Sequence, residues 1–274
     1  MKRTPFFLIL ILAACSPFSS SPSAGDPAPA TMQPSSLSPA QKLTIGKKIW
    51  QNECGGTVDG LTTWNAGEEF PSLGIGHFIW YTANHKGPFT ESWPQFMAFC
   101  QKNKVAPPAV GLQAHCPWPT SAEFKKEFRS PQMNELRQWL AANVALQTDF
   151  IIARSQAALP KILAQAPAND RSRIAANYQK VAATPNGQYA LIDYVNFKGD
   201  GLNPSERYAG KGWGLLQVLG GMKQVESGPA AATEFAASAK RALNRRIDNS
   251  PSARGESRWR EGWLNRCDTY ARPL

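Results

Sequence analysis

A short stretch near the start of the chain carries carboxylates, a hydroxyl and an imidazole at spacings that suit acid–base chemistry. Glu53 comes first, Glu68 and Glu69 follow, and Ser72 and His77 complete the stretch. Cleavage of a glycosidic bond commonly needs a protonated carboxylic acid at the leaving oxygen and a second group that handles water or a cation-like sugar. Glu53 is the candidate acid, and Glu68, Glu69 and Ser72 are candidates for the second catalytic role.

The residues before Glu53 predict the helix that would hold it. Ser38-Pro39 is typical of an N-cap followed by proline at the first helical position, and Gly55-Gly56 would end the helix. A negative charge at a helix C-terminus is disfavoured by the helix dipole, which argues against a merely solvated glutamate there.

Apolar neighbours indicate how Glu53 could keep its proton. Trp50 lies one helical turn before it and Phe78 follows the glycine-rich stretch. Burial against such residues raises the pKa of a carboxyl, so the sequence predicts a protonated Glu53.

Beyond these residues the pattern is mostly helical. Turn and strand residues dominate from 57 to about 81, where we expect a small hairpin. Helical periodicity follows over residues 121–142, 144–164, 170–183, 189–197, 214–225 and 230–247. The sequence predicts one α+β domain, mainly helical, with a small early β-hairpin.

The run from Ile45 to His77 resembles the catalytic segment of phage-type lysozymes. In that family a helix ends in the catalytic Glu, and a hairpin brings an Asp and then a Thr, followed directly by Ile-Gly-Ile-Gly-His. Glu53 matches the family's Glu, Ser72 stands in place of the Thr, and Leu73-Gly74-Ile75-Gly76-His77 matches the strand after it. Ala66 lies where the family has its aspartate, and the nearest carboxylates are Glu68 and Glu69. The resemblance implies a lysozyme-like domain.

A second polar and aromatic run supplies candidates for substrate binding. Tyr194, Asn196 and Gln217 could line a sugar cleft together with His77, because aromatic faces and amides suit sugar rings and N-acetyl groups. Gly214-Leu215-Leu216-Gln217 resembles the Gly-Leu-Met-Gln segment of lytic transglycosylases. The alternative is a glycine-flanked buried helix with core aromatics, which we favour for Trp213, and a structural His77.

The first residues predict export and a lipid anchor. Lys2 and Arg3 precede an apolar run that is shorter than the about 20 residues needed to span a membrane. The run ends in Leu12-Ala13-Ala14-Cys15, which resembles the bacterial lipobox. We expect a signal peptide over 1–14, lipidated Cys15 with a Ser/Pro/Ala-rich tether over 15–37, and the folded domain over 38–274. By the same resemblance, Ser16 favours the outer membrane, with the domain facing the periplasm.

Charge and cysteine content narrow the partners. A net charge of +10 suits an anionic polymer or an anionic lipid surface, and export argues against nucleic acid. Two disulfides among the four cysteines after Cys15 could be paired in three ways, and we expect Cys100 with Cys116 and Cys54 with Cys267. Scattered histidines give no metal-ligand spacing, so neither a metal nor a cofactor is expected, and we expect a monomer.

Together these observations predict a lipid-anchored glycoside hydrolase of the cell envelope that cleaves the glycan strand of peptidoglycan, with Glu53 as general acid. A lytic transglycosylase, a chitosanase-like enzyme, a catalytically degenerate lysozyme-like domain that only binds cell-wall glycan, and an envelope assembly lipoprotein are the alternatives.

Overall fold

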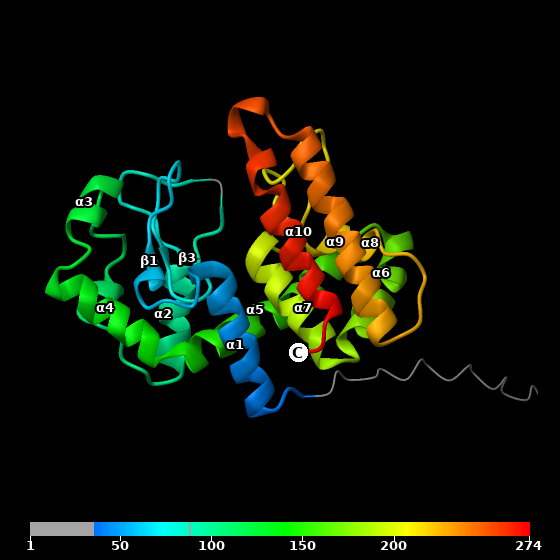
Figure 1. Ribbon diagram of the computed structural model, residues 1–274, viewed down its shortest axis with the longest axis horizontal. Helices are drawn as coiled ribbons and strands as arrows, with labels where there is room; N and C mark the ends of the chain where they lie inside the picture. The colour runs from blue at the N-terminus through cyan, green and yellow to red at the C-terminus, as the bar shows by residue number, and fades with distance from the viewer. Residues whose placement is uncertain (1–35, 88) are drawn as a thin grey trace, which may run out of the picture. The chain divides into compact units, whose positions relative to one another are not determined.

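The computed structural model describes residues 36–87 and 89–274 (Figure 1). The expected signal peptide, Cys15 and the tether as far as residue 35 lie outside the described residues.

The helix that carries Glu53 begins and ends where its capping residues predict. Helix α1 (Pro39–Cys54) starts after Ser38, whose side chain accepts a hydrogen bond from the Gln41 N–H while the Gln41 side chain accepts one from the Ser38 N–H. Such a capping box satisfies two backbone donors that a helix start otherwise leaves free. Gly55 ends the helix with φ 61°, a left-handed conformation that glycine adopts without steric cost.

A small antiparallel sheet follows α1 directly. Its strands are β1 (Thr62–Thr63), β2 (Ser72–Leu73) and β3 (Phe78–Ile79), in the order β1-β2-β3. Ser72 in the central strand lies opposite Thr63 on one side and Ile79 on the other. The early strand region is therefore a three-stranded sheet, one strand more than the hairpin that the sequence predicts.

Helices make up most of the remaining described chain. A first group contains α2 (Trp93–Lys102), α3 (Ser121–Lys126), α4 (Pro131–Ala142) and α5 (Val144–Gln165). A second group contains α6 (Ala168–Ala182), α7 (Pro185–Lys198), α8 (Leu215–Gly220), α9 (Pro229–Asn249) and α10 (Arg260–Asp268). Short 3₁₀ turns lie at Asp59–Leu61, Ala109–Leu112, Ser252–Arg254, Glu256–Trp259 and Thr269–Ala271.

Long α5 brings the two groups of helices together. It packs against α1 and α2 from the first part of the chain and against α6 and α7 from the second (Figure 1). Fully buried aromatic residues, Phe78, Trp80, Trp93 and Phe96, fill the space beside the sheet. The mainly helical α+β class that the sequence predicts is confirmed.

The expected helix over 121–142 is wrong in one respect, because the chain forms two helices there. Ser130 accepts a hydrogen bond from the Met133 N–H and Pro131 occupies the first helical position, so a new helix starts at this point. The expected helix over 214–225 is also shorter, since α8 ends at Gly220.

Candidate functional site

Glu53 is the centre of a polar cluster drawn from distant parts of the chain. It lies in the last turn of α1, and 13% of its side chain is exposed. Its Oε1 accepts hydrogen bonds from Arg266 Nη2 at 2.7 Å and from Asn196 Nδ2 at 3.2 Å. Its Oε2 lies 3.5 Å from His77 Nδ1. Helices α7 and α10 and the turn after β2 therefore meet at the end of α1.

Asp193 holds Arg266 from the other side. Asp193 is fully buried, and its two carboxylate oxygens accept hydrogen bonds from Arg266 Nη2 and Nε, each at 2.8 Å. The Tyr270 hydroxyl donates a third hydrogen bond to Asp193 at 2.7 Å. Arg266 thus bridges two carboxylates, and this bidentate pairing fixes the plane of its guanidinium.

The charge of Glu53 differs from the sequence-based prediction. Burial by itself raises the pKa of Glu53, but Arg266, then His77 and Lys198, outweigh burial and lower the pKa below its ordinary value of 4.5. The predicted protonated Glu53 is therefore wrong for the free protein. The apolar neighbours near in sequence suggested burial, whereas the decisive arginine comes from α10.

The Gly-Ile-Gly-His segment shapes the turn that carries His77 to Glu53. Gly74 has φ 67°, and a Cβ there would lie 2.2 Å from Gln147 Oε1, which accepts the Ile75 N–H at 2.9 Å. A Cβ at Gly76 would lie 2.5 Å from the Phe78 ring. Both positions therefore require glycine, and His77 itself adopts a left-handed φ of 47°.

Of the two candidate second carboxylates, Glu68 lies near this cluster and Glu69 does not. Glu68 lies in the segment that joins β1 to β2 and is partly buried, and its Oε2 accepts a hydrogen bond from Asn65 Nδ2 at 2.9 Å. Burial raises the pKa of Glu68, and the Glu53 charge raises it further, against the lowering effects of Asn65 and His77. Exposed Glu69 instead pairs with His85 Nδ1 at 2.9 Å.

Ser72, Tyr194 and Gln217 lie where they stabilise the fold rather than in a cleft. Ser72 is buried in the central strand. Tyr194 is fully buried and donates a hydrogen bond to the Trp213 carbonyl at 2.7 Å, so its expected place in a cleft is wrong. Gln217 donates to the Gly201 carbonyl at 3.1 Å and packs against that glycine, which makes it a brace for the loop before α8.

A cleft opens beside the Glu53 cluster. Its cavity measures about 570 Å³, within the usual range for small-molecule sites. His77, Asn196 and Lys198 line it. A role in substrate binding stays a prediction for His77 and Asn196. Aromatic walls come from Phe99, Phe150 and Trp213 and cations from Arg154, Lys161, Lys198 and Arg246. Trp213 is nearly buried, as favoured, but still reaches the cavity wall.

Sequence reasoning missed the ion pair of Arg266 with Asp193 beside Glu53. Asp193 and Asn196 lie three residues apart on α7, and Tyr189 precedes Asp193 by one turn, so all three share a helix face. Tyr189 and Asp193 both approach the Asn52 amide, at 3.0 and 3.5 Å. A row of polar residues on one face of an otherwise apolar helix could have identified Asp193 from the sequence. No sequence pattern marks Arg266, because its partners come from other elements.

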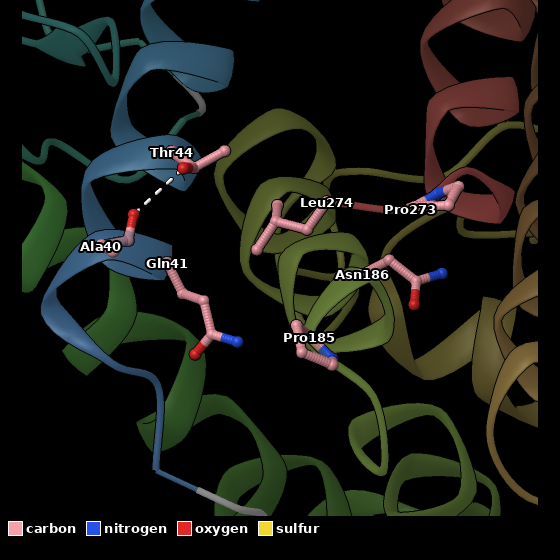
Figure 2. Close-up of a pocket in the computed structure, with 7 residues that line it drawn as sticks. All are labelled: Ala40, Gln41, Thr44, Pro185, Asn186, Pro273 and Leu274. Carbon is pink, nitrogen blue, oxygen red and sulfur yellow. Dashed lines mark hydrogen bonds between the residues drawn. The ribbon is translucent and has the colours of Figure 1, made fainter.

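A second cavity lies where the chain end approaches α1 (Figure 2). It measures about 350 Å³ and is lined by Ala40, Gln41, Thr44, Pro185, Asn186, Pro273 and Leu274. The Thr44 hydroxyl donates to the Ala40 carbonyl at 3.0 Å, the dashed line in Figure 2. None of these seven side chains is ionisable, so acid–base chemistry is better supported at the cleft.

Neither expected disulfide is formed. Cys54, Cys100, Cys116 and Cys267 are all buried free thiols. Cys54 Sγ lies 3.4 Å from the Gly74 carbonyl and Cys116 Sγ lies 3.5 Å from the Trp118 carbonyl. Both thiols therefore contact backbone acceptors rather than the cysteines with which we expected them to pair.

Comparison of the chain with protein-family models, curated proteins and solved structures gave no match. Within residues 36–87 and 89–274, no helix combines the length and apolar character needed to cross a membrane. The same residues contain no group of three or more His, Cys, Asp or Glu side chains placed to hold a metal ion.

Proposed function

We propose that the chain is a lysozyme-type glycosidase that cleaves the glycan strand of peptidoglycan, with Glu53 at the centre of the reaction. The observation that carries the proposal is the position of Glu53. This largely buried carboxylate ends a helix, contacts the histidine of a Gly-Ile-Gly-His turn, and lies behind a cleft whose walls combine aromatic rings and polar groups. Such a cleft can stack sugar rings and orient them by hydrogen bonds.

The directions of the pKa shifts suggest how two carboxyls divide the work. Glu53 is held ionised by Arg266, whereas burial favours the protonated form of Glu68. Environments that push two carboxyl pKa values apart distinguish the proton donor from the anion. We therefore assign Glu68 to protonate the glycosidic oxygen and ionised Glu53 to activate water or stabilise the developing positive charge. This exchanges the role that the sequence assigned to Glu53.

A digest of purified peptidoglycan tests the function. We expect the chain to release soluble fragments, and the Glu53→Gln variant to be slower by about 100-fold or more, because a positioned acid or base typically contributes that much. Glu226→Gln, a change at an exposed carboxyl, is the matched control and should match the wild type. Mass spectrometry of the products separates reducing ends, expected of a hydrolase, from anhydro ends, expected of a lytic transglycosylase.

An inactive wild type that still sediments with peptidoglycan would overturn the enzyme and leave a glycan-binding domain. An envelope assembly lipoprotein that acts through its basic surface would give a different result. A pull-down would then recover envelope proteins and no glycan, and added salt would abolish the recovery.

The division of roles has its own test. A glycoside with a good leaving group needs no proton donor, so Glu68→Gln should retain most activity on an aryl glycoside while losing it on peptidoglycan. Glu53→Gly should be inactive on both substrates and partly rescued by azide, which can replace a missing carboxylate. Aryl glycoside activity of Glu53→Gly without azide would return the acid role to Glu53.

We also propose that this domain is anchored by lipid at Cys15 and faces the periplasm from the outer membrane. Fractionation of cells should find the wild type with the membranes. A Cys15→Ser variant should not acquire lipid. Membrane association that persists without lipid at this position would contradict the anchor.

A further inference from the structure

The cleft contains a lysine without an ionic partner. Lys198 is the last residue of α7, and its Nζ lies 3.8 Å from the centre of the Phe197 ring and 3.4 Å from that of Trp263. No carboxylate among the described residues lies within ion-pair distance of it. Burial and two nearby arginines lower the pKa of Lys198 well below its ordinary value, so its charged form lacks compensation. Glu53 and Glu256 act in the opposite direction. However, each is already bound by an arginine.

Arg154 on α5 is a second cation of this kind on the cleft wall. It is partly buried, and its guanidinium faces the Phe150 ring at 5.6 Å. Within the described part of the chain it forms no hydrogen bond or ion pair. Asp200 lies within its electrostatic reach, but Asp200 Oδ1 accepts the Leu202 N–H at 3.0 Å.

The other ionisable groups of the cleft do not neutralise these two. Arg246 is occupied by Glu256, which accepts hydrogen bonds from its Nε at 2.8 Å and its Nη2 at 2.9 Å. Burial raises the pKa of Glu206, which favours its neutral form. Lys161 is exposed and adds a further positive charge at the edge. Basic side chains on the cleft wall thus outnumber the two acidic ones, Asp200 and Glu206.

Partly buried basic groups without an acidic partner are costly in their charged form, since burial removes their water and the facing aromatic rings replace only part of it. A bound anion would supply that replacement by charge-assisted hydrogen bonds. A sugar polymer of neutral units has no such group, and a polymer of amino sugars would be repelled. Peptidoglycan carries carboxylates on its stem peptides and on those lactyl groups that bear no peptide.

We propose that Arg154 and Lys198 form a carboxylate-binding subsite in the cleft, which selects acid-bearing glycan over chitin or chitosan. The identity of the glycan rests on the proposed function; the subsite itself rests on two basic side chains that line the cleft and have no acidic partner within ion-pair distance among the described residues.

Calorimetric titration of the full chain with short glycans tests the subsite directly. The probes are the disaccharide of N-acetylglucosamine and N-acetylmuramic acid, the same disaccharide with its lactyl carboxyl amidated, the disaccharide carrying its stem peptide, and neutral chitobiose. We expect an acid-bearing probe to bind about tenfold more tightly than its neutral counterpart, because a hydrogen bond to a charged group contributes that order of affinity. Preference for the lactyl acid over its amide identifies the lactyl group. Preference limited to the peptide-bearing probe identifies the stem peptide.

Matched variants assign the effect to the two cations. Arg154→Gln and Lys198→Gln should each remove the preference for acid, and Lys198→Arg should restore most of it. Lys125→Gln, a change at an exposed lysine on α3, should leave the preference intact. Equal binding of acid-bearing and neutral probes by the wild type, or no binding of any, would overturn the subsite. The same holds if Lys125→Gln weakens the preference as much as the cleft variants do.

Digestion of peptidoglycan by the same preparations separates the two proposals. Cleavage without any preference for acid-bearing probes overturns the subsite and leaves the enzyme. A clear preference without cleavage overturns the enzyme and leaves the subsite.

Discussion

At the scale of single residues, Arg266 contributes to both charge and stability at the site. It lies between Asp193 and Glu53, and 8% of its side chain is exposed. Removing one member of a buried ionic network leaves the remaining charges without compensation. We expect Arg266→Gln to lower the free energy of unfolding by about 3–5 kcal/mol, measured by urea denaturation.

The pair of Arg129 with Asp59 is the matched control for this change. It has similar bidentate geometry, at 3.0 and 2.7 Å, but both side chains are at least half exposed. Exposed pairs are screened by water and salt, so Arg129→Gln should barely change stability. Equal effects of the two substitutions would show that burial of the Arg266 network has no energetic consequence.

Glu53 predicts a specific pH dependence of stability. Its pKa is lower in the folded state than its ordinary value of 4.5, so folding favours the ionised form. The resulting stabilisation is fully present above that ordinary value and is lost as the pH falls through the lower folded pKa. Denaturation curves across this acidic range should show a steeper loss of stability for the wild type than for Glu53→Gln. Parallel curves would contradict the ionised Glu53.

At the scale of elements, the turn between β2 and β3 depends on glycine for two separate reasons. Gly74→Ala would strain a left-handed backbone at a cost of about 1–2 kcal/mol, and it would also displace Gln147 from the Ile75 N–H. Gly67 has φ 82°, and a Cβ added there would meet no atom within 4 Å, so Gly67→Ala carries the backbone strain alone. Unfolding experiments should therefore find Gly74→Ala the more destabilising, with lower activity as well. Equal costs would rule out the close approach of Gln147.

Local signals explain which elements the sequence could predict. Helix α1 was predictable at both ends because its cap residues, Ser38 and Gly55, act within one turn. The break before α4 was marked by Ser130-Pro131 but was hidden by continuous helical periodicity. Helix α2 was not among the predicted helices, and its short segment contains Pro94 and several aromatic residues, which are weak helix signals.

At the scale of the whole molecule, the candidate site is assembled from contacts that no local pattern contains. The resemblance located Glu53 and His77, and both lie at the site. It could not reveal Arg266, which is 213 positions further along the chain than Glu53 and reverses its expected charge state. Tyr194 and Asn196 are separated by one residue, so the helix turns one toward the core and the other toward Glu53.

The four described cysteines give a prediction for the molecule as a whole. Burial raises the thiol pKa to about 12 at Cys54, Cys116 and Cys267 and to about 11 at Cys100. Since the thiolate is the reactive form, a thiol reagent should label none of them in the native protein and all four after unfolding. A reducing agent should leave the urea midpoint unchanged, because there is no disulfide among these residues to break. A lower midpoint under reducing conditions, or fewer than four labelled thiols in the unfolded and unreduced chain, would instead support the pairs expected from the sequence, whose loss typically costs about 2–4 kcal/mol.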